Sequence, residues 1–188
     1  MKAVLLDGLL ETDASSPVQE IIVTELQRIG WGVDPVVLRE VEIADCAGCF
    51  GCWIRTPGVC VIDDVARDIA ARVIQSDLVI FLTPITFGGY SSELKKALDR
   101  LICLVLPFFR KIDGEIHHSA RYERYPRLVG VGVLGQPDDE AERLFATLIE
   151  RNAINLHSPA HAASVLLTSQ GEGDMRERVR TILGKVGA

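Results

Sequence analysis

Residues 77–82, with the sequence DLVIFL, are an almost unbroken apolar run that predicts a buried β-strand. The loop TPITFGGYSS follows at residues 83–92, and the next residues predict a helix from about Ser92 to Leu101. A buried strand that leads through a loop into a helix is the first part of a βαβ unit, whose next strand is parallel to the first. The stretch therefore indicates an α/β protein with a parallel sheet.

Further strands are predicted on either side of this stretch, at Lys2–Leu6, Val33–Leu38, Arg127–Leu134 and Ser164–Thr168. Helical patterns separate them. Five strands alternating with five helices predict right-handed crossovers and one parallel sheet covered on both faces. The common strand order at this size is 2-1-3-4-5, so we expect an α/β, flavodoxin-like three-layer sandwich with a five-stranded parallel sheet.

All 188 residues are expected to form one flavodoxin-like domain, with an irregular insertion at about residues 104–126 that fits neither the strand nor the helix period. Its aromatic residues suggest a covered surface, and we expect a homo-oligomer, either a dimer or a tetramer. The adjacent histidines His117 and His118 are interpreted as exposed or as part of a subunit contact. The first helix is expected to begin with Ser16 as N-cap, followed by Pro17 and a capping-box Gln19.

Composition excludes several functions. The net charge of −6 and the lack of a basic cluster argue against binding to nucleic acid or to an anionic membrane. No apolar run is long enough to cross a bilayer, and the N-terminal residues do not resemble a signal peptide. An odd number of cysteines, five in all, without an export signal favours a reducing cytoplasm over a disulfide scaffold.

Four of those cysteines lie in one segment, DCAGCFGCWIRTPGVCVIDD at residues 45–64. Cys46, Cys49, Cys52 and Cys60 have the spacing C-x2-C-x2-C-x7-C, and such tight runs hold iron–sulfur clusters. Structural zinc is a weaker alternative because its cysteines usually form two separated pairs. A set of reduced thiols that bind no metal is the other alternative. Cys103 lies among apolar residues and is interpreted as a core residue.

The predicted sheet indicates where a ligand would bind. In such folds ligands bind beyond the carboxyl ends of the strands, at the switch point between strands 1 and 3. The loops there are Asp7–Ser15, Thr83–Ser91 and Gly135–Pro137. The cysteine segment follows strand 2, so we expect it to border the same crevice. Thiols at the rim of a cofactor pocket suggest redox chemistry.

Two stretches beside the compact cysteine run, GVCVIDD at residues 58–64 and TPITFGGYSSELKKALDR at residues 83–100, resemble the NADPH-dependent FMN reductase branch of the flavodoxin-like superfamily. Within that branch they are most similar to the iron–sulfur flavoproteins. The resemblance implies FMN at the switch point, a 4Fe-4S cluster on the four cysteines and NAD(P)H as a transient co-substrate. The residues that it places against the flavin ring are Pro84, Ile85, Thr86, Phe87, Gly88, Gly89, Gly135 and Gln136.

The loop DGLLETDASSP at residues 7–17 departs from the family, which usually has a Gly-Ser-rich phosphate loop with a basic residue. Glu11 and Asp13 would repel a phosphate, and no arginine or lysine in the loop compensates. Thr12, Ser15 and Ser16, together with the helix N-terminus, are the expected phosphate site.

The first hypothesis is therefore an FMN-dependent oxidoreductase that accepts electrons from a nicotinamide or a protein donor, with no acid–base catalytic residue. The second is a non-catalytic, flavodoxin-like electron carrier. The third is a binding module whose acidic first loop has lost FMN.

Overall fold

The computed structural model describes residues 1–13, 16–112 and 114–188. Within these ranges the main sheet has five parallel strands in the order β2-β1-β3-β6-β7. The strands, in sequence order, are β1 (Lys2–Asp7), β2 (Gly32–Val37), β3 (Leu78–Pro84), β6 (Arg127–Leu134) and β7 (His161–Leu167). The strand positions predicted from sequence agree with these to within a few residues at each end.

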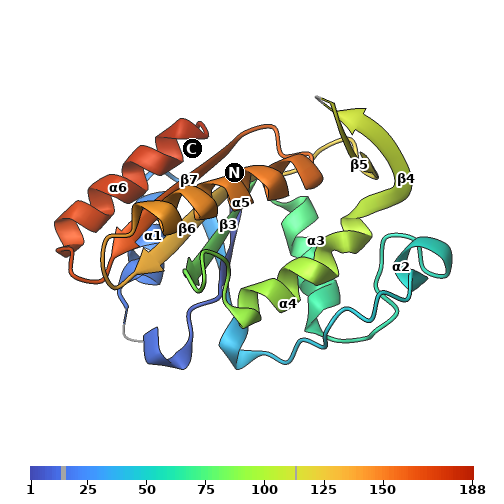
Figure 1. Cartoon of the computed structure of the whole chain (residues 1–188), viewed down its shortest axis with the longest axis horizontal. Coiled ribbons are helices and arrows are strands. Elements are labelled where there is room, and N and C mark those ends of the chain that lie inside the picture. The colour runs from blue at the N-terminus through green and yellow to red at the C-terminus, as the bar shows by residue number, and fades with distance from the viewer. Residues whose placement is uncertain (14–15, 113) are drawn as a thin grey trace.

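Helices cover both faces of the sheet (Figure 1). One apolar core lies under α1 (Val18–Arg28) and α6 (Glu172–Lys185). The other lies under α3 (Val65–Gln75), α4 (Ser92–Arg100) and α5 (Asp139–Asn155). The predicted three-layer α/β arrangement is confirmed.

Alternation along each strand divides its side chains between the two cores. In β1, Ala3 and Leu5 pack under α1 and α6, whereas Val4 and Leu6 pack under α3 and α4. Successive side chains of a strand point to opposite faces, so a strand covered on both sides is apolar throughout. This is why the runs KAVLL and DLVIFL in the sequence identify buried strands.

The expected strand order 2-1-3-4-5 is wrong in its numbering, because the described residues form seven strands rather than five. The insertion contains β4 (Val105–Ile112) and β5 (Glu115–Ala120), which pair with each other in an antiparallel hairpin outside the main sheet. Their polar and charged residues do not alternate with apolar ones, since much of the hairpin is exposed. Two side chains that follow the hairpin bond to the segment that precedes it. The Tyr125 hydroxyl donates to the carbonyl of Leu104 (2.7 Å), and Arg121 Nε donates to that of Cys103 (3.0 Å).

The capping box expected at the first helix is absent. Helix α1 begins at Val18 with Pro17 at the N-cap position, and no side chain caps it. Ser16 precedes the proline and is therefore one residue too early to cap. By contrast, α3 is capped as its sequence suggests, because the Asp64 carboxylate accepts from the backbone N–H of Ala66 (3.1 Å).

Four short helical segments complete the described elements. They are η1 (Glu11–Asp13), η2 (Leu38–Glu40), α2 (Gly51–Ile54) and η3 (Leu101–Leu104). None of the helices in the described ranges is both long enough and apolar enough to cross a membrane.

Candidate functional site

The loops that follow β1 and β3 meet at the carboxyl edge of the sheet, and β6 ends beside β3, with Val133 opposite Pro84. The backbone N–H of Gly8 donates to the carbonyl of Leu82 (2.8 Å), and the Ser91 hydroxyl donates to that of Gly8 (2.6 Å). A Cβ on Gly8 would lie 2.7 Å from Leu94 Cβ, so only glycine allows α4 to pack this closely on the end of β1. We call residues 8–13, 16–17, 85–91 and 135–138 the carboxyl-edge loops.

The turn between β3 and α4 has an unusual backbone. Thr86 and Gly89 pair with each other through two hydrogen bonds of 3.1 and 2.9 Å. The two residues between them both have positive φ, 51° at Phe87 and 75° at Gly88, which is the conformation of a type I′ turn. A phenylalanine rarely takes positive φ, and here its side chain is fully exposed. Strained, exposed backbone of this kind is frequent at ligand sites.

The predicted flavin-contacting residues differ in their surroundings. Ile85 packs inward over β6: its N–H donates to the carbonyl of Val133 (2.9 Å), and a Cβ on Gly132 would lie 2.6 Å from Ile85 Cδ1. Ile85 thus packs in part against β6, and it is half-buried. The other predicted members are also half-buried or exposed, namely Pro84, Thr86, Phe87, Gly88, Gly89, Gly135 and Gln136.

The predicted phosphate residues are only partly described. Thr12 is exposed and Ser16 is half-buried, whereas Ser15 lies outside the described residues. Glu11 is exposed as well, in agreement with the acidic character of the loop.

Arg39 is a cation at this loop that the loop sequence itself does not reveal. Arg39 belongs to η2, and its Nη1 lies 3.5 Å from the Asp7 carboxylate while its Nε lies 3.9 Å from that of Glu11. The side chain is 19% exposed, and its buried Nη1 has no hydrogen-bond partner within the described ranges. A signal for it exists in the sequence. Strand 2 lies beside strand 1, with Val37 opposite Asp7, so a basic residue just after strand 2 reaches the loop after strand 1.

Asp7 adds a buried carboxyl group at the same place. Its side chain accepts from the backbone N–H of Leu9 (2.8 Å). Burial raises the pKa of Asp7, and this effect outweighs the Leu9 hydrogen bond and the nearby Arg39 guanidinium, which both lower it. Three carboxylates thus lie within 4.0 Å of Arg39, those of Asp7, Glu11 and Glu40, at distances between 3.5 and 3.9 Å.

The cysteine segment forms a second candidate site. All four of its cysteines line one small cavity of about 80 Å³, which we call the cysteine cavity. Cys46 and Cys49 are exposed, Cys60 is half-buried and Cys52 is buried, and all four are free thiols. Burial raises the pKa of Cys52, and the neighbouring Cys60 raises it further. The residues that line the cavity are Cys46, Ala47, Gly48, Cys49, Phe50, Cys52, Trp53, Cys60, Ile62, Arg100 and Ile102.

The structure does not place this cavity at the switch point, where the sequence analysis expected it. Its lining includes Arg100 and Ile102, which lie at and beyond the carboxyl end of α4, whereas Ser91 at the other end of α4 contacts the carboxyl-edge loops. The length of α4, about 13 Å for nine residues, therefore separates the two candidate sites. The reason is that residues 41–45 run from the end of β2 along α4 before the first cysteine (Figure 1).

Arg100 joins the two ends of the cysteine segment. Its guanidinium forms two 2.8 Å hydrogen bonds with the Asp64 carboxylate and donates to the carbonyls of Ala44 (2.7 Å) and Ile62 (3.3 Å). Desolvation lowers the pKa of Arg100, but the Asp64 carboxylate and the Cys60 sulfur raise it by more, so the side chain stays charged. The pKa of Asp64 is correspondingly lowered, since Arg100 and two backbone N–H groups outweigh its desolvation.

Arg100 was not among the predicted site residues, although the sequence of α4 contains a signal for it. Leu94, Ala97 and Arg100 recur every three residues on the buried face of α4. A charged residue in such a position needs a partner or a ligand. The same rule would have identified a buried arginine near the cysteines.

The hairpin β4–β5 packs against Trp53, which lines the cysteine cavity. Trp53 Nε1 donates to the carbonyl of Val105 in β4 (2.9 Å), and the indole ring lies 4.9 Å from the His118 ring in β5. Trp53 therefore anchors the cysteine segment to the insertion. His117 bonds to Asn155 and Glu115, so the two adjacent histidines have separate surroundings.

The four thiols are not arranged to bind a single metal ion. No three His, Cys, Asp or Glu side chains of the described chain form a group that fits one ion. The four thiols instead surround a common space.

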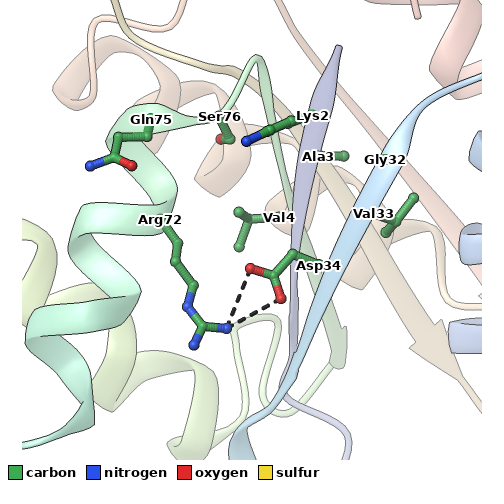
Figure 2. Close-up of a pocket in the computed structure, with 9 residues that line it drawn as sticks. All are labelled: Lys2, Ala3, Val4, Gly32, Val33, Asp34, Arg72, Gln75 and Ser76. Carbon is green, nitrogen blue, oxygen red and sulfur yellow. Dashed lines mark hydrogen bonds and ion pairs between the residues drawn. The ribbon is translucent and has the colours of Figure 1, made fainter.

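A larger pocket of about 400 Å³ lies at the opposite, amino edge of the sheet (Figure 2). It lies between the first residues of β1 and β2 and the end of α3, and its main charged groups pair with each other, with Arg72 Nη1 3.2 Å from the Asp34 carboxylate. Because ligands of open α/β sheets bind at the carboxyl ends of the strands, this pocket is not the candidate site.

Solved structures confirm the fold. The chain resembles an NAD(P)H:quinone oxidoreductase from Methanothermobacter marburgensis, with a TM-score of 0.70, 13% identity and 98% of both chains covered. It also resembles an NADH:FMN oxidoreductase, with a TM-score of 0.67, 12% identity and coverage of 98% of this chain and 87% of that one. At such identities the likeness establishes the architecture alone.

Curated relatives align over shorter stretches. An iron-sulfur flavoprotein from Methanosarcina thermophila is 33% identical over 75 residues, 40% of this chain and 38% of that protein. One from Archaeoglobus fulgidus is 28% identical over 103 residues, 54% of this chain and 46% of that protein. These alignments span less than half the length of the relatives. Residues 1–123 match the NADPH-dependent FMN reductase family, which is well over half of the sequence, and the chain belongs to that family.

Proposed function

We propose that this chain is an FMN-dependent oxidoreductase that accepts electrons from NAD(P)H or from a protein donor. The main support is that the family match includes the loops after β1 and β3, which meet at the carboxyl edge of the sheet. FMN would supply the redox chemistry there, as a carrier of hydride or of single electrons. The chain would bind and orient it.

The residues at this edge fit a flat ring with a phosphate tail. The exposed turn at Thr86–Gly89 and the neighbouring Gly135 offer backbone groups to a ring edge, and glycine lets that edge come close. Thr12, Ser15 and Ser16 would hold the phosphate at the start of α1. Arg39 supplies the positive charge that the loop sequence lacks. Its buried Nη1 has no hydrogen-bond partner in the described part of the chain, so it has a donor to offer a phosphate.

We further propose that Cys46, Cys49, Cys52 and Cys60 hold a 4Fe-4S cluster. Four free thiols around one common space are the donor set that such a cluster requires, since each thiolate binds a different iron. The cluster would supply single-electron transfer. The chain would contribute the four thiolates and a cover formed by Trp53, whose indole is held by its hydrogen bond to Val105.

A homo-oligomer stays a prediction. The hairpin exposes Phe108, Phe109 and Ile116, each by about two thirds or more, and such side chains favour a contact between subunits. Light scattering of the purified protein would give its mass. A monomer at micromolar concentration would contradict the prediction.

The proposal is tested by anaerobic purification followed by reconstitution with FMN, iron and sulfide. We expect a flavin spectrum, bound iron and steady-state oxidation of NADPH or NADH. Gly135→Trp should block the ring site, because Gly135 is exposed and has open space where a side chain would begin. Gly184→Trp in α6 is the matched control, since Gly184 has open space too but lies far from the carboxyl-edge loops.

The outcomes separate the alternatives. FMN binding that Gly135→Trp abolishes and Gly184→Trp preserves, with nicotinamide turnover, supports the enzyme. Bound FMN that only a reduced protein can reduce indicates an electron carrier. Protein that binds no FMN even at millimolar concentration contradicts both.

A further inference from the structure

The Arg100 side chain has one nitrogen that the fold leaves unused. Its Nε is buried and has no hydrogen-bond partner in the described ranges. The residue is 1% exposed, so water does not reach it freely. An unpaired, buried, charged donor is expensive to keep, and natural proteins seldom retain one without a ligand or a role.

The rest of the guanidinium is fixed. Both terminal nitrogens bond to the Asp64 carboxylate, and each also donates to a backbone carbonyl, Ala44 from Nη1 and Ile62 from Nη2. These contacts lie on both sides of the cysteine segment. The planar group therefore cannot turn to satisfy its Nε elsewhere.

Arg100 also lines the cysteine cavity, and it is the one charged residue among the described residues that do so. The other lining residues are the four cysteines, glycine, alanine and apolar or aromatic side chains. A sulfur-containing group in this cavity would therefore lie beside the Arg100 charge.

From this geometry we infer that Arg100 is a positioning residue that tunes the cluster, with Nε–H donating to a sulfur of the group held by Cys46, Cys49, Cys52 and Cys60. The inference rests on the proposed cluster. Hydrogen bonds to cluster sulfurs and nearby positive charge raise the reduction potential, because the electron that reduces a cluster adds one negative charge. Arg100 would thus favour the reduced cluster while it holds the two ends of the segment together.

The test compares reduction potentials of reconstituted Arg100→Lys and of the unmodified protein. Lysine keeps one charge for Asp64 but cannot bind Asp64 and the cavity together. We expect at least a tenfold weaker reduction equilibrium, a midpoint lower by about 59 mV or more for a one-electron couple. Arg180→Lys is the control, because Arg180 bonds to Glu25 (2.7 Å) on the opposite face of the sheet and does not line the cavity. Its midpoint should be unchanged.

A second measurement does not depend on the lysine variant taking up iron. Pulsed EPR of the reduced, unmodified protein labelled with ¹⁵N-arginine should show a nitrogen coupled to the cluster. Arg67 Nε lies 2.7 Å from the Cys60 carbonyl, so Arg67→Gln is needed to exclude that arginine and should retain the coupling. A midpoint in Arg100→Lys equal to that of the unmodified protein, or no arginine coupling in iron-loaded protein, overturns the inference alone. Protein that takes up no iron overturns the cluster proposal and this inference with it.

Discussion

The cysteine cavity and the carboxyl-edge loops each contain an arginine beside carboxylates, but the two arginines are held differently. Arg100 is 1% exposed and forms four hydrogen bonds of 2.7 to 3.3 Å with Asp64 and two carbonyls. Arg39 is 19% exposed in its side chain, and its contacts to Asp7, Glu11 and Glu40 are 3.5 to 3.9 Å long. The Arg100 guanidinium is fixed by short hydrogen bonds within the fold, whereas the Arg39 guanidinium has only longer contacts.

This difference fits the two proposed ligands. A covalently bound cluster needs a preformed cage, and a buried ion pair that joins both ends of the cysteine segment provides one. An exchangeable cofactor instead needs groups that can change partners when it binds. The following predictions test whether the two sites are as different as their arginines suggest, from the largest expected effect to the smallest.

Loss of one cysteine should have the largest effect. Cys52→Ser removes a proposed ligand, and we expect iron affinity to fall by more than about 100-fold, because the loss of outer partners alone costs 10- to 100-fold. Cys103→Ala is the control: Cys103 is buried too, but it lies outside the cavity, and burial raises its pKa to about 11. Iron and sulfide per chain are measured after reconstitution. Equal iron in both variants would remove the distinction between the cysteines.

Loss of the Arg39 charge should weaken FMN binding by about 10- to 100-fold, since a hydrogen bond to a charged group contributes about 1.5–3 kcal/mol. Arg39→Met is compared with Arg72→Met at the amino-edge pocket, which should bind FMN normally. Riboflavin, which has no phosphate, should bind Arg39→Met as well as it binds the unmodified protein. If fluorescence titration shows that both flavins lose affinity equally, Arg39 does not act on the phosphate.

Removal of the Asp7 charge should strengthen FMN binding by about fivefold, because a like charge near 4 Å contributes about 1 kcal/mol in water. Asp7→Asn keeps an acceptor for the Leu9 N–H. The raised pKa of Asp7 also has a stability consequence. The folded state holds this proton more tightly, so the contribution of Asp7 to the free energy of unfolding falls as pH rises from about 4 through the raised pKa.

Chemical denaturation at several pH values checks this stability effect. The unmodified protein should lose stability over that pH window, and Asp7→Asn should lose less. Two identical pH profiles would show that the Asp7 carboxyl is not destabilised by burial.

A change far from both sites should leave both ligand affinities unaltered. Glu25 in α1 accepts from Arg28 (2.9 Å) and Arg180 (2.7 Å), and these bonds outweigh burial and lower its pKa to about 2. Glu25→Gln should lower the free energy of unfolding by about 1–3 kcal/mol at pH 7. The difference from the unmodified protein should shrink as pH falls from about 4.5 towards 2, because the unmodified carboxylate then becomes protonated. Any change in iron or FMN affinity would show that stability alone affects the sites.

The sheet could be predicted from the sequence because burial on both faces leaves a direct signal. DLVIFL and RLVGVGVL are apolar at nearly every position, and each forms a strand in the place expected. The hairpin left no such signal. Phe109 pairs with His118 and Arg110 with His117 across its two strands, so its stability comes from cross-strand pairs that a local pattern does not reveal.

The sequence was enough to predict the cysteines and loop residues of the candidate sites, but not the two arginines that lie beside them. The cysteine spacing identified one set of side chains that the fold does bring together. Both arginines were missed because each acts over a long sequence separation, 32 residues from Asp7 to Arg39 and 36 from Asp64 to Arg100. Only the pairing of strands and the packing of α4 bring those charges into contact.

Trp53, which its hydrogen bond to Val105 holds in the cysteine cavity, is also an intrinsic fluorescent probe of that cavity. Trp53 lines the cysteine cavity, whereas Trp31, the only other tryptophan in the sequence, is buried against the opposite face of the sheet. A strongly absorbing chromophore in the cavity would quench the indole emission of Trp53 and leave more of that of Trp31. Uptake of a cluster could thus be followed in real time, without a label, by the fall in Trp53 fluorescence.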